Sequence, residues 1–231
     1  PLWSRGLGDV YKRQSLESAL TCLDKLDPTL CRVKIGKELF TSAGPESVKQ
    51  ATDRGFDVFL DLKFHDIPNT VAGAIRSAIS LEPRILNVHA LGGRDMLLAS
   101  RDAIDNEINK LGCKPPLLFG VTVLTSMDNG DLLETGIPGS VLEQVKRLTL
   151  LCVESGLDGV VCSANEIETV REVGGPNFKI ITPGIRPAWF ERGDKKRIVT
   201  PVSYTHLRAH ETREDRVLRH VVEKKKGRGG G

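Results

Sequence analysis

The chain has 231 residues, of which 39% are hydrophobic and 27% are charged, an ordinary composition for a globular protein. Its length suits one α/β barrel or two small domains, and no apolar run approaches the roughly 20 residues that a membrane-spanning helix needs. The net charge of +3 comes from the two ends, residues 1–14 and 202–231, and the basic run near the C-terminus has no interleaved aromatic residues, which argues against a nucleic-acid partner.

The five cysteines are scattered along the chain and include no Cys-x-x-Cys pair. Their odd number and irregular spacing favour reduced, mostly buried thiols over a disulfide framework or a zinc site. Residues 1–14 also lack the continuous apolar stretch of a secretory signal. We therefore expect a cytoplasmic protein that holds no metal.

Short apolar runs alternate with helical patterns between Ser15 and Pro201, which is typical of a parallel α/β fold. Six runs are apolar almost throughout, as expected for strands that are covered on both faces. In chain order these strand candidates are Cys31–Ile35, Val58–Leu62, Ile85–His89, Leu117–Val123, Gly159–Cys162 and Lys179–Thr182.

The helices between these strands are indicated by start signals and by apolar spacing. Pro45 and the Pro68-Asn69-Thr70 run each mark a helix start, and Ser163-Ala-Asn-Glu166 has the form of a capping box. The clearest helix carries apolar residues at three- and four-residue spacing. Its predicted buried face consists of Val141, Leu142, Val145, Leu148, Leu151 and Cys152.

Polar residues gather where the predicted strands end, which favours a (β/α)₈ barrel with its active site at the carboxyl ends of the strands. They are Lys34, Asp61, Lys63, Asn87, His89, Thr125, Ser126 and the run 182–186. An open doubly wound sheet would also place ligands there, but it usually carries a glycine-rich first turn, and the chain has no G-x-G-x-x-G. A barrel needs eight strands, so we expect an incomplete one.

The two ends of the chain do not resemble its middle. Residues 1–14 and 202–231 show neither strand alternation nor a sustained helical stripe, and they resemble translated linker or adaptor sequence. We therefore expect one partial barrel domain over 15–201, flanked by non-native or disordered tails.

The richest run for chemistry is Asp61-Leu-Lys63-Phe-His-Asp66. Residues two apart on a strand point the same way, so Asp61 and Lys63 are expected to face the barrel mouth together, with Asp66 in the following loop. Two carboxylates around one ammonium keep Lys63 protonated, as a proton donor, beside a substrate. The alternative is purely structural: a buried ion-pair network, with Asp66 as a helix N-cap.

The twelve residues from Phe59 to Thr70 resemble the signature of the orotidine 5′-phosphate decarboxylase family in its bacterial form. Further runs resemble that family in the same order along 15–201. They are 32–40, 87–90, 121–127, 158–163 and Thr182-Pro-Gly-Ile-Arg-Pro187.

This resemblance implies a (β/α)₈ barrel that works as a homodimer on a nucleotide substrate, without metal or organic cofactor. Lys63 would protonate carbon 6 of the pyrimidine as carbon dioxide leaves, and Asp61 would lie near the departing carboxylate and hold Lys63. Asp66 and Thr70 would reach the partner's site across the dimer interface. Lys34 would bind the ribose hydroxyls.

The resemblance also assigns the remaining substrate contacts. Ile67 and Thr125 would contact the substrate, Thr125 at its pyrimidine or ribose, and Arg186 would pair with the phosphate. The family commonly has a phosphate-binding glutamine after this arginine, where the present chain has the run 193–197. Lys195 in that run would meet the phosphate as a point charge.

The first and eighth strands of the family's barrel have no counterpart in residues 1–14 or after Pro201. We therefore expect low stability and little activity from this chain, since strands two and seven would expose their edges. Two other functions stay open. One is a related magnesium-dependent sugar-phosphate decarboxylase or aldolase barrel, and the other is an inactive nucleotide-binding fragment.

Overall fold

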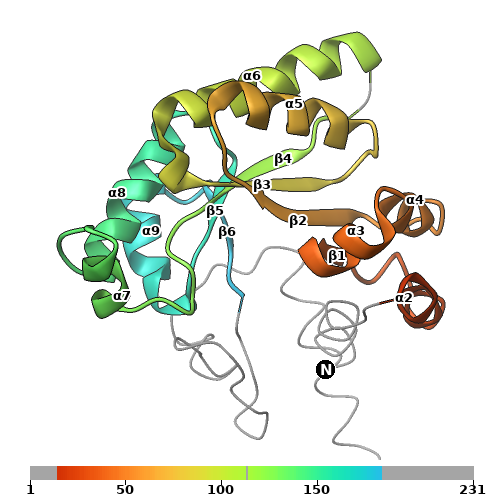
Figure 1. Cartoon of the computed structure of the whole chain (residues 1–231), viewed down its shortest axis with the longest axis horizontal. Helices are drawn as coiled ribbons and strands as arrows, with labels where there is room; N and C mark the ends of the chain where they lie inside the picture. Colours follow the sequence, from red (N-terminus) through yellow and green to blue (C-terminus); the bar gives the residue numbers. More distant parts are fainter. Residues whose placement is uncertain (1–14, 113, 184–231) are drawn as a thin grey trace, which may run out of the picture. The chain divides into compact units, whose positions relative to one another are not determined.

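The computed structural model describes residues 15–112 and 114–183 of the chain (Figure 1). Its six strands follow one another through the sheet in chain order. They are β1 (Val33–Gly36), β2 (Val58–Phe64), β3 (Ile85–His89), β4 (Leu117–Val121), β5 (Gly159–Val161) and β6 (Lys179–Ile181). The registers of β1 with β2, β4 with β5 and β5 with β6 are parallel. All six predicted strands are confirmed, and their ends differ from the prediction by at most two residues.

Helices connect the strands, as the predicted alternation requires. They are α2 (Leu16–Leu23), α3 (Lys37–Ala43), α4 (Glu46–Thr52), α5 (Pro68–Ile79), α6 (Gly93–Leu111), α7 (Asn129–Glu134), α8 (Val141–Glu154) and α9 (Ile167–Gly174), with short 3₁₀ turns η1 (Ala90–Gly92) and η2 (Ala164–Glu166). Pro68 is the first residue of α5, where its fixed φ suits the helix and its missing N–H is not needed. The predicted capping box is confirmed, because the Ser163 N–H donates to the Glu166 carboxylate at 2.8 Å.

The chain forms two compact units. The first contains the described residues 15–62 and 77–86. In it, α2, α3 and α4 gather beside β1 (Figure 1). Its core is built from apolar side chains of β1, β2 and these helices, which lose almost all contact with water. They include Val33, Ile35, Leu39, Val48 and Leu60.

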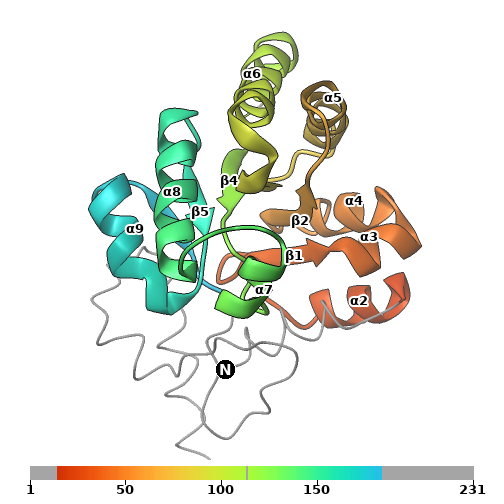
Figure 2. The same ribbon diagram turned by 60° about the vertical axis from the view of Figure 1, so that its left-hand side comes forward.

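The second unit contains the described residues 63–76, 87–112 and 114–183. Within it, α8 and α9 lie side by side, and α8 packs on β4 and β5 (Figure 2). Val145, Leu148 and Cys152 of α8 are buried as predicted. Leu142 is 47% exposed, so its predicted burial is wrong. It lies in the first turn of α8, beyond the part of the helix whose face is covered.

Candidate active site

In the first unit, Lys34 and Asp61 form an ion pair at the carboxyl ends of two neighbouring strands. The parallel register aligns Gly36 of β1 with Asp61 of β2. The Lys34 ammonium donates a hydrogen bond to Asp61 Oδ2 at 2.9 Å. Asp61 is only 7% exposed, so its charge would be costly without a cation beside it. The structure therefore brings together the two predicted site residues of this unit.

In the second unit, Lys63 is held through its backbone. Its N–H donates to the side-chain oxygen of Asn87 at 2.8 Å. Its φ is +51°, a left-handed value that residues other than glycine rarely adopt. The prediction that Lys63 faces the same way as Asp61 assumed the regular alternation of a strand, which this φ interrupts.

The loop after β2 leads directly into α5, and three predicted site residues are exposed in the loop and in the first turn of this helix. The Asp66 carboxylate accepts a hydrogen bond from the Ile67 N–H at 2.7 Å. A helix N-cap would instead bind an N–H of the second or third helical residue, which are Asn69 and Thr70. Ile67 is 67% exposed, and Asp66 and Thr70 are exposed as well. These side chains are therefore accessible to a ligand or to another chain.

Two histidines lie close to this loop. The rings of His65 and His89 are 5.2 Å apart between centroids and tilted by 39°. His65 directly precedes Asp66, and His89 ends β3. The ring contact links the run 61–66 to β3, a relation that was not predicted from the sequence.

Beyond β4 the two threonines differ in their surroundings. Thr122 is buried, and its hydroxyl donates to the Val161 carbonyl at 3.0 Å, which serves the pairing of the sheet. Thr125 is half-buried in the turn that follows, so it is more accessible than Thr122. Arg186 and Lys195 lie outside the described residues.

From the sequence, Asn87 was predicted only as one of several polar residues near the ends of the strands. It is 1% exposed and stands between Leu86 and Val88, both fully buried. A buried amide costs free energy unless it is hydrogen-bonded, so a polar residue inside an apolar strand is itself a signal of a specific partner. The chain sequence could not identify that partner as the Lys63 backbone.

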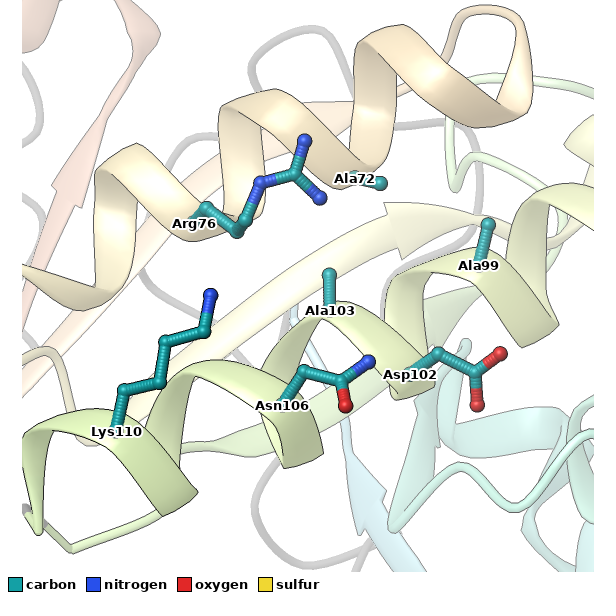
Figure 3. Close-up of a pocket in the computed structure, with 7 residues that line it drawn as sticks. All are labelled: Ala72, Arg76, Ala99, Asp102, Ala103, Asn106 and Lys110. Atoms are coloured by element: carbon teal, nitrogen blue, oxygen red, sulfur yellow. The ribbon is translucent and has the colours of Figure 1, made fainter.

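The second unit also contains an open hollow of about 540 Å³ between α5 and α6 (Figure 3). Alanines form part of its lining, and the polar side chains at its edge are exposed. Its lining residues are Ala72, Arg76, Ala99, Asp102, Ala103, Asn106 and Lys110. It contains none of the predicted site residues, so we place the candidate active site at the strand ends instead.

Two kinds of feature are absent from the described residues. Over 15–112 and 114–183, the structure has no group of three or more histidine, cysteine, aspartate or glutamate side chains arranged to hold a metal ion. In the same ranges, none of the helices combines the length and apolar character needed to cross a membrane.

Comparison with known proteins assigns this arrangement to a family. The sequence profile of the Orotidine 5'-phosphate decarboxylase / HUMPS family matches residues 9–204. The orotidine 5'-phosphate decarboxylase of Pectobacterium atrosepticum is 53% identical over 188 residues, which are 81% of this chain and 74% of that protein. The enzyme of the same name from Aliivibrio fischeri is 54% identical over 184 residues, covering 80% of this chain and 77% of the relative.

Solved structures agree with the sequence comparison. The crystal structure of orotidine 5'-phosphate decarboxylase from Lactobacillus acidophilus matches with a TM-score of 0.75 and 32% identity, over 94% of this chain and 96% of that one. The enzyme from Methanocaldococcus jannaschii, at 18% identity and a TM-score of 0.62 over 92% and 94%, shares the fold. The predicted (β/α)₈-barrel fold class is thereby confirmed, with six of its strands among the described residues. The chain therefore belongs to the orotidine 5′-phosphate decarboxylase family.

Proposed function

We propose that this chain converts orotidine 5′-phosphate to uridine 5′-phosphate and carbon dioxide, the reaction of pyrimidine synthesis named by its relatives. The observation that carries the proposal is the ion pair of Lys34 with the buried Asp61, which lies in β2, the strand that also holds Lys63. Asp61 and Lys63 are two residues apart in the sequence, so β2 carries both a carboxylate and an ammonium group.

In the proposed mechanism, the bond between carbon 6 and the substrate carboxylate breaks, and its electron pair stays on carbon 6. Carbon dioxide leaves, and Lys63 donates a proton from its ammonium to carbon 6. The lysine then regains a proton from water. A cation fixed beside the developing carbanion stabilises it without reorganisation at the moment of reaction.

The other predicted residues bind and orient the nucleotide in this scheme. Lys34 binds the ribose hydroxyls, Ile67 contacts the substrate, and Thr125 contacts its pyrimidine or ribose. Arg186, with Lys195, binds the phosphate. Support for Lys34 comes from its half-buried side chain, which Asp61 holds in one orientation. The free energy of binding the ribose and the phosphate orients the substrate, so the reacting carboxylate itself need not be bound tightly.

Turnover of orotidine 5′-phosphate tests this function. Enzyme is used in excess over substrate, so that even a slow rate is detected, and uridine 5′-phosphate is measured over time. We expect product from the wild-type chain, with and without a metal chelator, and none above background from Lys63→Ala. Loss of activity with the chelator would favour the magnesium-dependent sugar-phosphate class. Binding of uridine 5′-phosphate without turnover would identify an inactive nucleotide-binding fragment.

We further propose that the chain forms a homodimer in which Asp66 and Thr70 complete the partner's site. Their exposure, Asp66 in the loop before α5 and Thr70 in the first turn of that helix, supports this role. If Asp66 acts across the interface, mixing inactive Lys63→Ala with inactive Asp66→Asn creates mixed dimers in which one site holds both native residues. We expect activity to reappear on mixing. Dimers that exchange subunits without regaining activity would contradict the proposal.

A further inference from the structure

The left-handed backbone of Lys63 needs an explanation. Its φ of +51° costs a side-chain-bearing residue about 1–2 kcal/mol relative to the extended form. Such a conformation persists when the surrounding structure imposes it, and it is most often found at functional sites. The backbone conformation also decides where a side chain leaves the strand, so any group that imposes this φ also directs the Lys63 ammonium.

Asn87 is the group that contacts this strained backbone. Its side-chain oxygen accepts the Lys63 N–H at 2.8 Å, an ordinary length for a strong amide hydrogen bond. Asn87 is 1% exposed, between two fully buried apolar residues of β3. An apolar side chain would suit that position better, since a buried amide is tolerated only in exchange for its hydrogen bonds.

β3 contacts the run 61–66 at a second place. His89 lies two residues after Asn87 on β3, and its ring lies 5.2 Å from that of His65. Alternate residues of a strand point to the same side. Asn87 and His89 therefore contact Lys63 and His65 in the same order along the chain.

We propose that Asn87 is a positioning residue, whose side-chain oxygen holds Lys63 in its left-handed conformation and so directs the ammonium towards the reacting carbon. The inference rests on the proposed function, because it concerns where that proton donor is aimed. Asn87 contributes nothing to nucleotide affinity in this account. A displacement of about 1 Å in a reacting group lowers a rate by about 100-fold.

Asn87→Leu tests the role, because leucine has a similar volume and no acceptor. We expect its single-turnover rate constant to fall by about 100-fold, while its affinity for uridine 5′-phosphate stays that of the wild type. A residue that merely supports the fold would lower rate and affinity together. Ser100→Ala is the matched control, since it removes another buried hydrogen bond of the same unit, from the Ser100 hydroxyl to the Met96 carbonyl, and should change neither quantity.

Amide hydrogen exchange gives a second, independent measurement. We expect the Lys63 N–H to exchange slowly in the wild-type chain and faster in Asn87→Leu, with the Leu60 amide unchanged in both. Should Asn87→Leu fail to fold, Asn87→Ser, whose hydroxyl is too short to reach, replaces it in both measurements. A full rate in the variant, a parallel loss of rate and affinity, or rapid exchange at Lys63 in the wild type would overturn the inference. Absence of turnover in the wild type itself would instead count against the proposed function.

Discussion

At the scale of single residues, the Lys34–Asp61 ion pair is the main electrostatic feature of the candidate site. The side chain of Asp61 is 10% exposed and that of Lys34 is 23% exposed, so both charges are largely removed from water. Attraction between buried charges roughly offsets the cost of desolvating them, whereas removing one partner leaves the other uncompensated. Such a pair is therefore better explained by the charge that it presents to a ligand than by stability.

Lys34→Met tests, in the unliganded chain, how strongly the buried Asp61 depends on the Lys34 ammonium. Because the Asp61 carboxylate would lose this ion pair while staying buried, we expect the free energy of unfolding to fall by about 1–3 kcal/mol, measured by urea titration. Adding Asp61→Asn should recover part of the loss, since the neutral amide no longer needs the cation. Lys37→Met, an exposed lysine of α3, is the control and should have almost no effect. Equal effects of the two lysine variants would contradict the account.

At the scale of elements, close packing of α8 on β4 requires a residue without a side chain. A Cβ atom on Gly120 of β4 would lie 2.3 Å from Cys152 Sγ of α8, far inside van der Waals contact. Burial raises the pKa of the Cys152 thiol to about 12, so this cysteine is a neutral packing group.

Of the four cysteines in the described ranges, Cys152 and Cys162 are buried and Cys22 and Cys31 half-buried, so the expected burial holds for half of them.

Gly120→Ala should therefore destabilise the chain by overpacking, by about 1–3 kcal/mol in thermal or urea unfolding. Combining it with Cys152→Ala should cost less than the sum of the two single changes, because the second change removes the clashing sulfur. Gly73→Ala in α5 is the comparison, since a Cβ there meets nothing closer than 3.8 Å. If the losses of unfolding free energy caused by Gly120→Ala and Cys152→Ala simply add, the new Cβ atom does not clash with the Cys152 sulfur, and this explanation is wrong.

At the scale of the whole molecule, the order of strands and helices followed from the sequence because it depends on local patterns. The apolar runs at β2 and β3 predicted their strands, and Pro68 predicted the start of α5. Apolar spacing shows which face of a helix is buried but not how far along the helix it is covered, which is why the burial of Leu142 was predicted wrongly.

The candidate site was predictable in its residue types but not in its backbone. The charges of Asp61, Lys63 and Asp66 are visible in the sequence, and so is the lone amide of Asn87 in an apolar strand. The φ of Lys63 is not, because strand alternation assumes a regular backbone, and the left-handed residue breaks it. The Lys34–Asp61 contact depends in turn on the register of β1 with β2, which short-range patterns do not determine.

The central claim is that Lys63 delivers the proton that replaces the departing carboxylate. It is tested most directly by incubating excess wild-type chain, and separately Lys63→Ala, with orotidine 5′-phosphate in D₂O. The position of deuterium in the uridine 5′-phosphate is then determined by NMR. The account predicts product with deuterium at carbon 6 from the wild type and no product above background from Lys63→Ala. Deuterated product formed equally fast by Lys63→Ala would contradict it.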